Sequence, residues 1–348
     1  MRRLLVVDFL CAEAHRMFNM NVVRALSDFS EVTLVSVNDY YNQNSEELRT
    51  LGVKVINYNY DLKKLSRYHA KLMIIKNIIF CGKLSKHKNY DFVIALAHDT
   101  ILSLFIPFMF HGVRVGLFHH KNLDELKSYI KKRIFSLYKD KIYHFVFEDS
   151  FKKCLVNDYS VPETLVFSIP HPIAPRTIAE RTISFDCIGL CHENDEFFLD
   201  RIEELSNEIV GKGLKFVFRS KNQRQSTKNI TFIKGFLNYS DYEGIIASSK
   251  TVFVPLPQYY QLRLSASIYD AFSWHKKVFT TSLSHAHEFE NKYPGICSYV
   301  SGPSDLLLQL EKDAFLNTNE DSFNRFVTEH SIPYVSAELK KTLAGIFC

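Results

Sequence analysis

Polar residues of several kinds gather in the stretch from Thr251 to Thr281, TVFVPLPQYYQLRLSASIYDAFSWHKKVFTT. An apolar run, Val252 to Val254, predicts a strand, and a loop containing proline follows it. The loop leads into an expected helix that carries Arg263, Ser265, Ser267 and Asp270. Open α/β sheets bind ligands at such a place, outside the carboxyl ends of their strands. The start of a helix offers free N–H groups and a positive dipole, so the stretch predicts a phosphate site.

Other polar residues follow the expected strands of the C-terminal half. Arginine and lysine supply fixed positive charge for a diphosphate, and arginine can bind it with two parallel hydrogen bonds. Ser265 could donate to a phosphate or simply cap its helix. Asp270 could meet ribose or sugar hydroxyls, or be a solvated acid. The candidate donor-binding residues are Arg219, Lys221, Gly235, Tyr259, Arg263, Ser265, Ser267 and Asp270.

Histidines and carboxylates follow the expected strands of the N-terminal half. A hydroxyl that attacks a substrate needs a base within hydrogen-bonding reach, and histidine or a carboxylate suits that role. The candidates are His15, His98, Asp99, His119, His120 and Glu148. A histidine is more often structural than catalytic, but His119 ends a strand on the side expected to face a cleft. We therefore predict His119 as the catalytic residue, with Asp99 as the alternative base.

Several common motifs are absent from the sequence. It contains no GxxxxGK[ST], HExxH or GxSxG pattern, and its one GxG precedes an expected strand instead of following one. No two aspartates lie two residues apart, so the DxD pair that often holds a divalent metal is missing. The seven cysteines form no CxxC pair and are expected to be reduced thiols. The sequence thus indicates neither a metal nor a cofactor.

Strand and helix signals alternate along the whole chain, which predicts parallel sheets. Helices are expected at 101–110 and 123–138. Three prolines between Pro170 and Arg176 predict a linker, and the alternation then begins again. We expect an α/β protein with two Rossmann-like domains, 1–172 and 173–330, facing a cleft. The last segment, 331–348, is expected to be a helix that can cross back to the N-terminal domain.

Positive charge is concentrated in the N-terminal half, although the whole chain carries only +5. The segment from Leu62 to Tyr90 contains eight lysines or arginines and no acid, with apolar residues at roughly helical spacing. Such a basic helix can lie on an anionic membrane, or it can be a surface helix with its apolar stripe in the core. No apolar run is long enough to span a bilayer. We expect a cytoplasmic protein, possible contact of 62–90 with the inner face of the membrane, and no binding of nucleic acid.

Five segments resemble nucleotide-sugar-dependent glycosyltransferases of the two-Rossmann type, GT-B. VGLFHHKNLDEL resembles the family's strand and sugar-facing histidine, and HFVFEDSFKKCLV with TLVFSIPHPI resembles its hinge region. ITFIKGFLNYSDYEGIIASSKTVFVPL and RLSASIYDAFSWHKKVFTT resemble the donor-site run. The chain departs from one group's paired glutamates, which would fall on Leu262 and Asp270, and has Ala266 in place of a glycine. The resemblance implies the fold and a donor site more strongly than a particular sugar.

The resemblance implies a hexosyltransferase-type enzyme that moves a sugar from a nucleotide diphosphate to a glycan or lipid-linked acceptor. It further implies a role in bacterial cell-surface polysaccharide synthesis. The missing DxD pair predicts metal-independent catalysis, with Arg219, Lys221 and Arg263 offsetting charge on the leaving group in place of a metal. A nucleotide-sugar epimerase of the same fold is one alternative. A non-catalytic binding or partner protein is the other, since a glutamate is missing where Leu262 stands.

Overall fold

The computed structural model describes residues 1–11, 15–59, 67–174, 176, 182–191, 194–235, 237–312 and 319–348. The chain divides into two compact units. Unit 1 consists of Met1–Pro172 and His330–Cys348, and unit 2 consists of Ile173–Glu329. The C-terminal segment therefore belongs to the unit that the N-terminus begins.

Unit 1 forms, among its described residues, a seven-stranded parallel sheet in the order β3-β2-β1-β4-β5-β6-β7. Its strands are β1 (Arg2–Asp8), β2 (Ser30–Val37), β3 (Lys54–Tyr58), β4 (Phe92–Ala97), β5 (Arg114–Phe118), β6 (Tyr143–Val146) and β7 (Val166–Ser168). Its α-helices are α1 (Arg16–Ser27), α2 (Ser45–Thr50), α3 (Arg67–His87), α4 (Ile106–Met109), α5 (Asn122–Glu125), α6 (Tyr129–Ser136), α7 (Asp149–Asn157) and α15 (Ile332–Phe347). Short 3₁₀ turns are η2 (Asn42–Asn44), η3 (Leu102–Phe105), η4 (Lys139–Lys141) and η5 (Glu163–Leu165).

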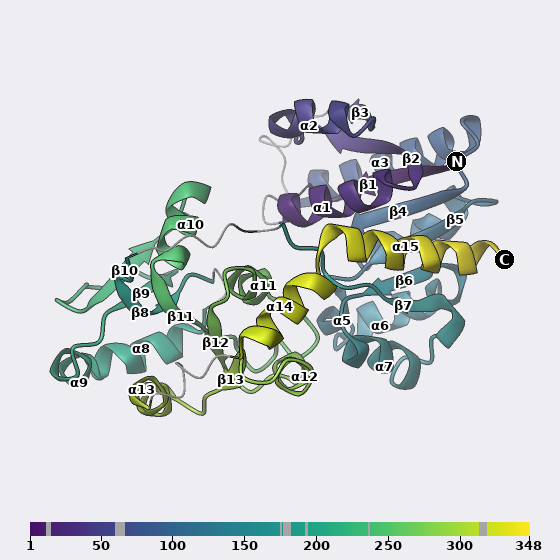
Figure 1. Cartoon of the computed structure of the whole chain (residues 1–348). Helices are drawn as coiled ribbons and strands as arrows, with labels where there is room; N and C mark the ends of the chain where they lie inside the picture. The colour runs from purple at the N-terminus through teal and green to yellow at the C-terminus, as the bar shows by residue number, and fades with distance from the viewer. Residues whose placement is uncertain are drawn as a thin grey trace. The chain divides into compact units, whose positions relative to one another are not determined.

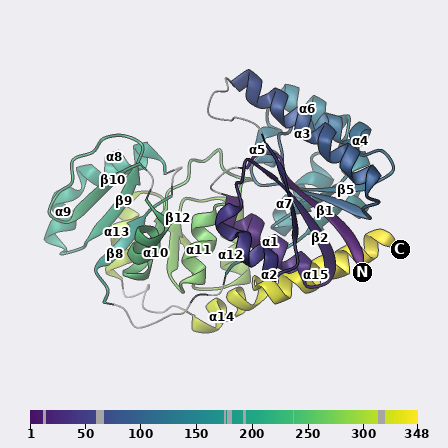
Figure 2. The ribbon, with the colours of Figure 1, turned by 90° about the horizontal axis from the view of Figure 1, so that it is seen from above.

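The central strands of unit 1 are buried on both faces, as their continuous apolar runs predict. Figures 1 and 2 show α1 and α15 on one face of the sheet and α3, α4 and α6 on the other. The last helix packs against α1 and buries Leu339 and Leu343. At its end, the Phe347 ring lies 3.5 Å from the Arg2 guanidinium. The last helix thus completes one face of unit 1.

Unit 2 has, in its described part, a six-stranded parallel sheet in the order β10-β9-β8-β11-β12-β13. Its strands are β8 (Phe185–Gly189), β9 (Phe216–Ser220), β10 (Ile230–Lys234), β11 (Ser249–Val254), β12 (Lys277–Thr280) and β13 (Cys297–Tyr299). Its helices are α8 (Glu196–Glu204), α9 (Ser206–Gly211), α10 (Tyr239–Ala247), α11 (Ala266–Ser273), α12 (Ser284–Lys292), α13 (Pro303–Glu311) and α14 (Glu320–Glu329). Along β11, Val252 and Val254 enter one apolar cluster with Phe272 of α11, whereas Phe253 enters another with Leu199 of α8. Helices therefore cover both faces of the sheet.

Both sheets place the first and fourth strands of their unit side by side, which is the Rossmann order 3-2-1-4-5-6. The chain reverses its direction across the sheet between β1 and β4, and again between β8 and β11. The predicted α/β class and the two Rossmann-like sheets are confirmed. The cleft expected between the domains stays a prediction.

Two helices expected from the sequence are interrupted. The 101–110 segment is the 3₁₀ turn η3 followed by the short helix α4, because Pro107 cannot donate to the preceding turn. The 123–138 segment breaks at Ser128, whose backbone is extended, and α6 begins at the next residue. No helix within the described ranges is long and apolar enough to cross a bilayer.

Candidate functional site

The carboxyl edge of the unit 2 sheet brings together the loops that follow β8, β9, β10 and β11. Asn194, just before α8, ties two of these loops together. Its Nδ2 donates to the carbonyl oxygens of Gly189 at 2.8 Å and Arg219 at 2.9 Å. The edge that the sequence predicts as a ligand site is therefore held by hydrogen bonds around the point where the strand order reverses.

The start of α11 has the properties of an anion site. Ser265 occupies the cap position but makes no capping hydrogen bond, and the first turn contains no acid. The side chain is 6% exposed, and its Oγ has no hydrogen-bond partner in the described part of the chain. Arg263, two residues earlier, lies with its guanidinium 4.0 Å from the centre of the Tyr260 ring. A buried hydroxyl donor, a helix start and a nearby cation thus converge here.

The starts of α8 and α10 differ from that of α11 because polar side chains already occupy them. Asp195 caps α8 by accepting from the Phe197 N–H, and Asn238 caps α10 by accepting from the Asp241 N–H. Both helices also carry an acid in the first turn, which repels a phosphate. Of these three helix starts, only that of α11 suits a diphosphate.

Tyr242 of α10 joins several predicted residues. Its hydroxyl donates to Asp270 Oδ2 at 3.0 Å. Burial raises the pKa of Tyr242 well above its usual value, the charge of Asp270 adds to this, and a hydrogen bond with Ser267 opposes it. Burial also raises the pKa of Asp270, against the charge of Arg176 and the Tyr242 hydrogen bond. Asp270 is therefore held inside unit 2 by Tyr242 and is not a solvated acid.

Arg219 lies within electrostatic reach of the same tyrosine. Burial lowers the pKa of Arg219, while Cys191 and Tyr242 work to raise it. The end of β9, the end of β8 and the helices α10 and α11 thus approach one another around Tyr242. Arg219, which is distant in sequence from Ser267 and Asp270, therefore belongs to the same neighbourhood as these two residues of α11.

A second cluster lies behind the turn that follows β9. The Arg224 guanidinium is 4% exposed and pairs with the carboxylates of Glu196 at 2.9 Å, Asp200 at 2.7 Å and Glu203 at 3.0 Å. Glu196 also accepts from the Lys221 N–H at 2.6 Å. Burial works to raise the pKa of Glu196, but the hydrogen bonds from Lys221 and Arg224 outweigh it, and the pKa is lowered. This cluster fixes the turn between β9 and Arg224.

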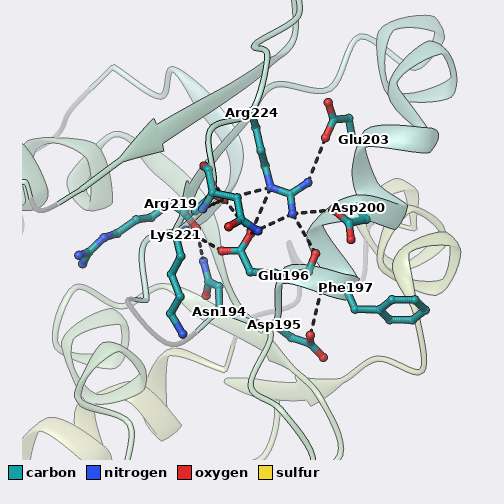
Figure 3. Close-up of polar contacts among 11 residues, drawn as sticks. Asn194, Asp195, Glu196, Phe197, Asp200, Glu203, Arg219, Lys221 and Arg224 are labelled. Carbon is teal, nitrogen blue, oxygen red and sulfur yellow. Dashed lines mark hydrogen bonds and ion pairs between the residues drawn. The ribbon is translucent and has the colours of Figure 1, made fainter.

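Figure 3 shows how the three cations of this turn differ. Arg224 points in among the carboxylates, whereas the side chains of Arg219 and Lys221 point away from them. The carboxylates are therefore engaged with the cation that the sequence does not single out. Arg219 and Lys221 stay on the outer side of the turn, where a diphosphate could meet them.

The remaining two predicted donor residues lie in loops of unit 2. Gly235 directly follows β10 and has a φ of +91°, a conformation that L side chains rarely adopt, and an added Cβ would meet no atom within 4 Å. Tyr259 is 60% exposed in the loop that leads to α11. Gly235 thus lets the chain turn at the sheet edge, and Tyr259 offers an aromatic surface there.

A pocket of about 220 Å³ opens at the carboxyl edge of unit 2. It is smaller than the pockets that usually hold small molecules. None of the eight predicted donor residues lines it. Its lining residues include Asp195, Phe197, Arg201, Leu256, Gln258, Thr281, Ser282 and Ser301.

His119 of unit 1 lies in a buried row of histidines. Its Nε2 is 2.9 Å from His144 Nδ1, and its ring meets that of His98 edge-on at 5.0 Å. His144 Nε2 faces the Lys139 carbonyl and must donate to it, so His144 Nδ1 accepts from His119. This leaves His119 Nδ1 as a lone pair, which has no partner among the described residues. His119 is 1% exposed, and burial lowers its pKa well below the usual value.

The other N-terminal candidates have structural contacts. Asp99 Oδ1 accepts from the N–H groups of Ile101 and Leu102, both at 2.9 Å, and so shapes the turn after β4. His98 Nδ1 pairs with Ser103 Oγ at 2.8 Å, and His120 Nε2 with the Leu96 carbonyl at 2.9 Å. The His15 ring stacks on His120 at 4.3 Å, and Glu148 is a buried residue at the start of α7.

A buried carboxylate at the end of β1 was not predicted from the sequence as a site residue. Asp8 is fully buried and accepts from the Cys11 N–H at 2.8 Å and from Asn19 Nδ2 at 2.7 Å. Burial raises the pKa of Asp8 to about 6, although these hydrogen bonds lower it. Asn19 Nδ2 also donates to the Tyr41 hydroxyl at 2.9 Å. The position of Asp8 at the carboxyl end of the first expected strand is the sequence feature that could have identified this residue.

The sequence of the chain matches no protein-family model, and no curated protein is significantly similar to it. Solved structures, in contrast, match over almost the whole chain. HepE of Anabaena, solved in complex with UDP-glucose, has 10% identity and a TM-score of 0.69, and the match covers 99% of this chain and all of HepE. The sucrose-phosphate synthase of Thermosynechococcus elongatus has 7% identity and a TM-score of 0.69, with 100% and 99% covered. These neighbours have two Rossmann-like domains, as this chain does.

The chain has the GT-B fold. A UDP-GlcNAc 2-epimerase of Neisseria meningitidis, solved bound to UDP-GlcNAc, is also similar to it. That structure has 15% identity and a TM-score of 0.58, with 99% of this chain and 100% of the epimerase covered. The GT-B fold is thus shared by neighbours with different reactions.

Within the described ranges, no group of three or more histidine, cysteine, aspartate or glutamate side chains could hold a metal ion.

Proposed function

We propose that this chain is a glycosyltransferase that takes a sugar from a nucleotide diphosphate. The start of α11 carries this proposal, because its buried Ser265 hydroxyl and Arg263 lie at the edge where the strand order reverses and would bind an anion there. Support also comes from HepE, a GT-B neighbour whose structure contains UDP-glucose. The N–H groups of α11 and the cations Arg263, Arg219 and Lys221 would bind the diphosphate.

The same cations would act in the chemical step. When the sugar leaves, negative charge grows on the nucleoside diphosphate. Fixed cations and helix N–H groups that face this charge stabilise the transition state more than the ground state. This arrangement would let the reaction proceed with no cofactor and no metal ion. Asp270 and Ser267, placed by Tyr242, would meet ribose or sugar hydroxyls, with Gly235 and Tyr259 beside the nucleoside.

His119 is the proposed base toward the acceptor hydroxyl. Burial keeps His119 neutral, and the hydrogen bond to His144 leaves the lone pair on Nδ1, the nitrogen that would take up a proton. Asp99 is the alternative, but one of its oxygens already accepts two backbone hydrogen bonds. The geometry of the two side chains therefore favours His119.

The acceptor is proposed to be a glycan or a lipid-linked glycan, in the synthesis of a bacterial surface polysaccharide. This pathway follows from the sequence resemblance. A cytoplasmic protein that touches the inner face of the membrane, as expected for 62–90, would meet such an acceptor where it is anchored. Part of that segment, residues 62–66, lies outside the described residues.

A thermal-shift screen tests the donor proposal. UDP, GDP, CMP and dTDP sugars are each added to the full chain. We expect sugars of one nucleotide class to raise the melting temperature of the protein. Arg263→Ala should weaken the binding of that nucleotide sugar by roughly tenfold or more, because a hydrogen bond to a charged group is worth about 1.5–3 kcal/mol. Arg325→Ala, which removes a half-exposed arginine on α14, serves as the control. If no nucleotide sugar shifts the melting temperature, the proposal is wrong.

A nucleotide-sugar epimerase is the second candidate, because the Neisseria epimerase shares the fold over its whole length. The two reactions differ in their need for an acceptor. NMR of a nucleotide sugar incubated with the chain alone would show a new sugar epimer only if the chain is an epimerase. A binding protein without catalysis would give neither epimer nor transfer, although it would still shift in the thermal screen.

A further inference from the structure

Helices α4 and α6 of unit 1 expose large apolar side chains to solvent. Phe108 of α4 is 61% exposed, and Ile130 of α6 and Leu137 at its end are 65% and 60% exposed. Tyr129, the first residue of α6, is 68% exposed. On α3, in contrast, Leu72 is the one large apolar side chain that is exposed within the described part of the helix. The exposed apolar surface therefore lies beside the basic helix predicted from the sequence, and not on it.

The apolar residues of α6 face two directions. Phe135 and, just beyond the helix, Tyr138 are each 1% exposed and pack inward. Ile130 and Leu137 are seven residues apart, so they share the opposite face at a separation of about 10 Å along the helix. A soluble helix usually covers that face with polar groups. The outer side of α6 therefore has apolar residues that no packing within unit 1 requires.

Cations lie against two of these exposed aromatic rings. Lys141 of η4 lies with its Nζ 5.7 Å from the centre of the Phe108 ring. Arg133 donates from Nε to the Tyr129 hydroxyl at 2.9 Å. Figure 2 shows α4 and α6 on the same side of the sheet as α3. We call the surface formed by these residues the basic-apolar surface; it comprises Phe108, Tyr129, Ile130, Arg133, Leu137 and Lys141.

Positive charge predominates around the basic-apolar surface, although Lys127, Lys131 and Lys139 pair with Asp124, Glu125 and Asp140. Residues 127–141 contain six lysines or arginines, and Asp140 is the single acid among them. Described residues of the adjacent helix α3 add exposed lysines and no acid. Lysine is depleted at protein–protein interfaces, so this composition does not favour a protein partner. The composition of the basic-apolar surface instead complements a partner that has negative charge at its surface and an apolar interior.

We propose that the basic-apolar surface docks unit 1 onto an anionic lipid bilayer. Phe108, Ile130 and Leu137 insert between the headgroups, and Tyr129 lies at the interface between water and hydrocarbon. The surrounding lysines and arginines bind the anionic headgroups, and their long chains let the ammonium groups reach them. The docking does not depend on the proposed glycosyl transfer. It would bring an enzyme of that kind to a lipid-linked acceptor.

Flotation of the full chain with lipid vesicles tests this proposal. Vesicles of phosphatidylcholine alone are compared with vesicles in which about one-third of the lipid is phosphatidylglycerol. We expect binding to the anionic vesicles only, and a loss of roughly tenfold or more when the salt rises from about 0.1 M to about 0.5 M. The triple variant Phe108→Ser, Ile130→Ser, Leu137→Ser should lose binding by roughly tenfold or more, since each side chain is mostly exposed and contributes little to the fold.

A matched control variant is Phe197→Ser, which removes a phenylalanine ring that is 67% exposed on unit 2. It should bind vesicles as the unchanged protein does. Equal binding by the triple variant and the unchanged protein would overturn the proposal, as would equal binding to neutral and anionic vesicles. A dimer in light scattering that the triple variant converts to a monomer would instead identify a protein interface and also overturn it. All vesicle measurements omit nucleotide, so a failed donor screen leaves this result unaffected.

Discussion

At the scale of single residues, His119 is the side chain whose protonation the hydrogen bonds assign. His144 accepts from Nε2 of His119, so the other ring nitrogen, Nδ1, keeps its lone pair. A base that acts in catalysis needs this unprotonated nitrogen. The burial that keeps His119 neutral also hides it, and an acceptor reaches it only if the side chains above it move.

The substitution His119→Gln separates the hydrogen bond to His144 from the ability of residue 119 to take up a proton. Glutamine can keep the hydrogen bond to His144 through its own Nε2, but it cannot take up a proton. We expect transfer to fall by about 10²–10⁴-fold in kcat, the usual contribution of a general base. The thermal shift caused by the donor should stay unchanged, because the predicted donor residues belong to unit 2. Unchanged kcat in this variant would remove His119 from the mechanism.

Tyr242 provides a second test at the residue scale. Tyr242→Phe removes the hydroxyl that donates to the partly buried carboxylate of Asp270 and should cost about 1–3 kcal/mol of unfolding free energy at pH 7. Since that hydrogen bond lowers the pKa of Asp270, its loss raises the pKa further. The cost should therefore shrink as the pH falls through the folded pKa and protonates Asp270.

Urea unfolding at pH 7 and at an acidic pH measures the cost. Tyr299→Phe is the control, because Tyr299 is 47% exposed in the same unit. A cost that does not change with pH would mean that Asp270 is not ionised in the folded protein.

At the scale of elements, the Arg224 cluster connects α8 to the turn after β9. Three carboxylates on one helix would repel one another without the buried guanidinium, and Glu196 would lose part of its hold on Lys221. We expect Arg224→Met to cost about 1–3 kcal/mol of stability, less than a fully buried pair because the carboxylates are partly exposed.

The same variant tests the positioning of Lys221. We expect the KM for the donor to rise by roughly three- to tenfold and kcat to fall as well, because the turn carries Arg219 and Lys221, which are proposed to bind the diphosphate and to offset its charge in the transition state. Arg224→Lys should recover part of the KM, as it restores one charge. A variant that is less stable but has an unchanged KM would show that the cluster is purely structural.

The sequence predicted the strands and helices that have strong hydrophobic patterns, but it did not predict which polar side chains are buried and paired. Apolar runs predicted the strands. Pro107 and Ser128 stand within the helices expected at 101–110 and 123–138, but the sequence analysis did not predict that these helices are interrupted. Arg219 and Arg224 stand in the same polar run, RSKNQR, and nothing in that run distinguishes them. Only the packing of α8 shows that Arg224 is buried and paired. His119 and His120 were likewise alike in sequence, although successive residues of an extended chain face opposite ways.

At the scale of the whole molecule, buried histidines are unevenly distributed between the units. Burial lowers the pKa of His15, His98 and His144 to about 4 and that of His171 to about 3. In unit 2, it lowers the pKa of His285 to about 4. Unfolded histidines have a pKa of about 6.5, so below that pH the unfolded chain binds protons that the folded chain does not. Unit 1 should therefore lose more stability than unit 2 as the pH falls from about 6.5 to about 4.

Asp8 works in the opposite direction, because its folded pKa of about 6 lies above the unfolded value of 3.8. One carboxyl group offsets only one of the imidazoles. Acid titration with two signals tests the difference. Trp274, the single tryptophan of the sequence, lies in unit 2 and its fluorescence reports that unit, whereas far-UV circular dichroism reports both. We expect the dichroism to change at a higher pH than the fluorescence. Coincident changes, or fluorescence changing first, would contradict this expectation.

The return of the chain from unit 2 to α15 has a consequence for biosynthesis. A ribosome makes the first strands of unit 1 before unit 2 and the helix that covers α1 after unit 2. At about 5–20 residues per second, the synthesis of unit 2 inserts a delay on the order of ten seconds or more. During that time, the face of unit 1 that receives Leu339 and Phe347 is open to chaperones and to other nascent chains. In a growing chain, unit 2 can therefore be complete before unit 1.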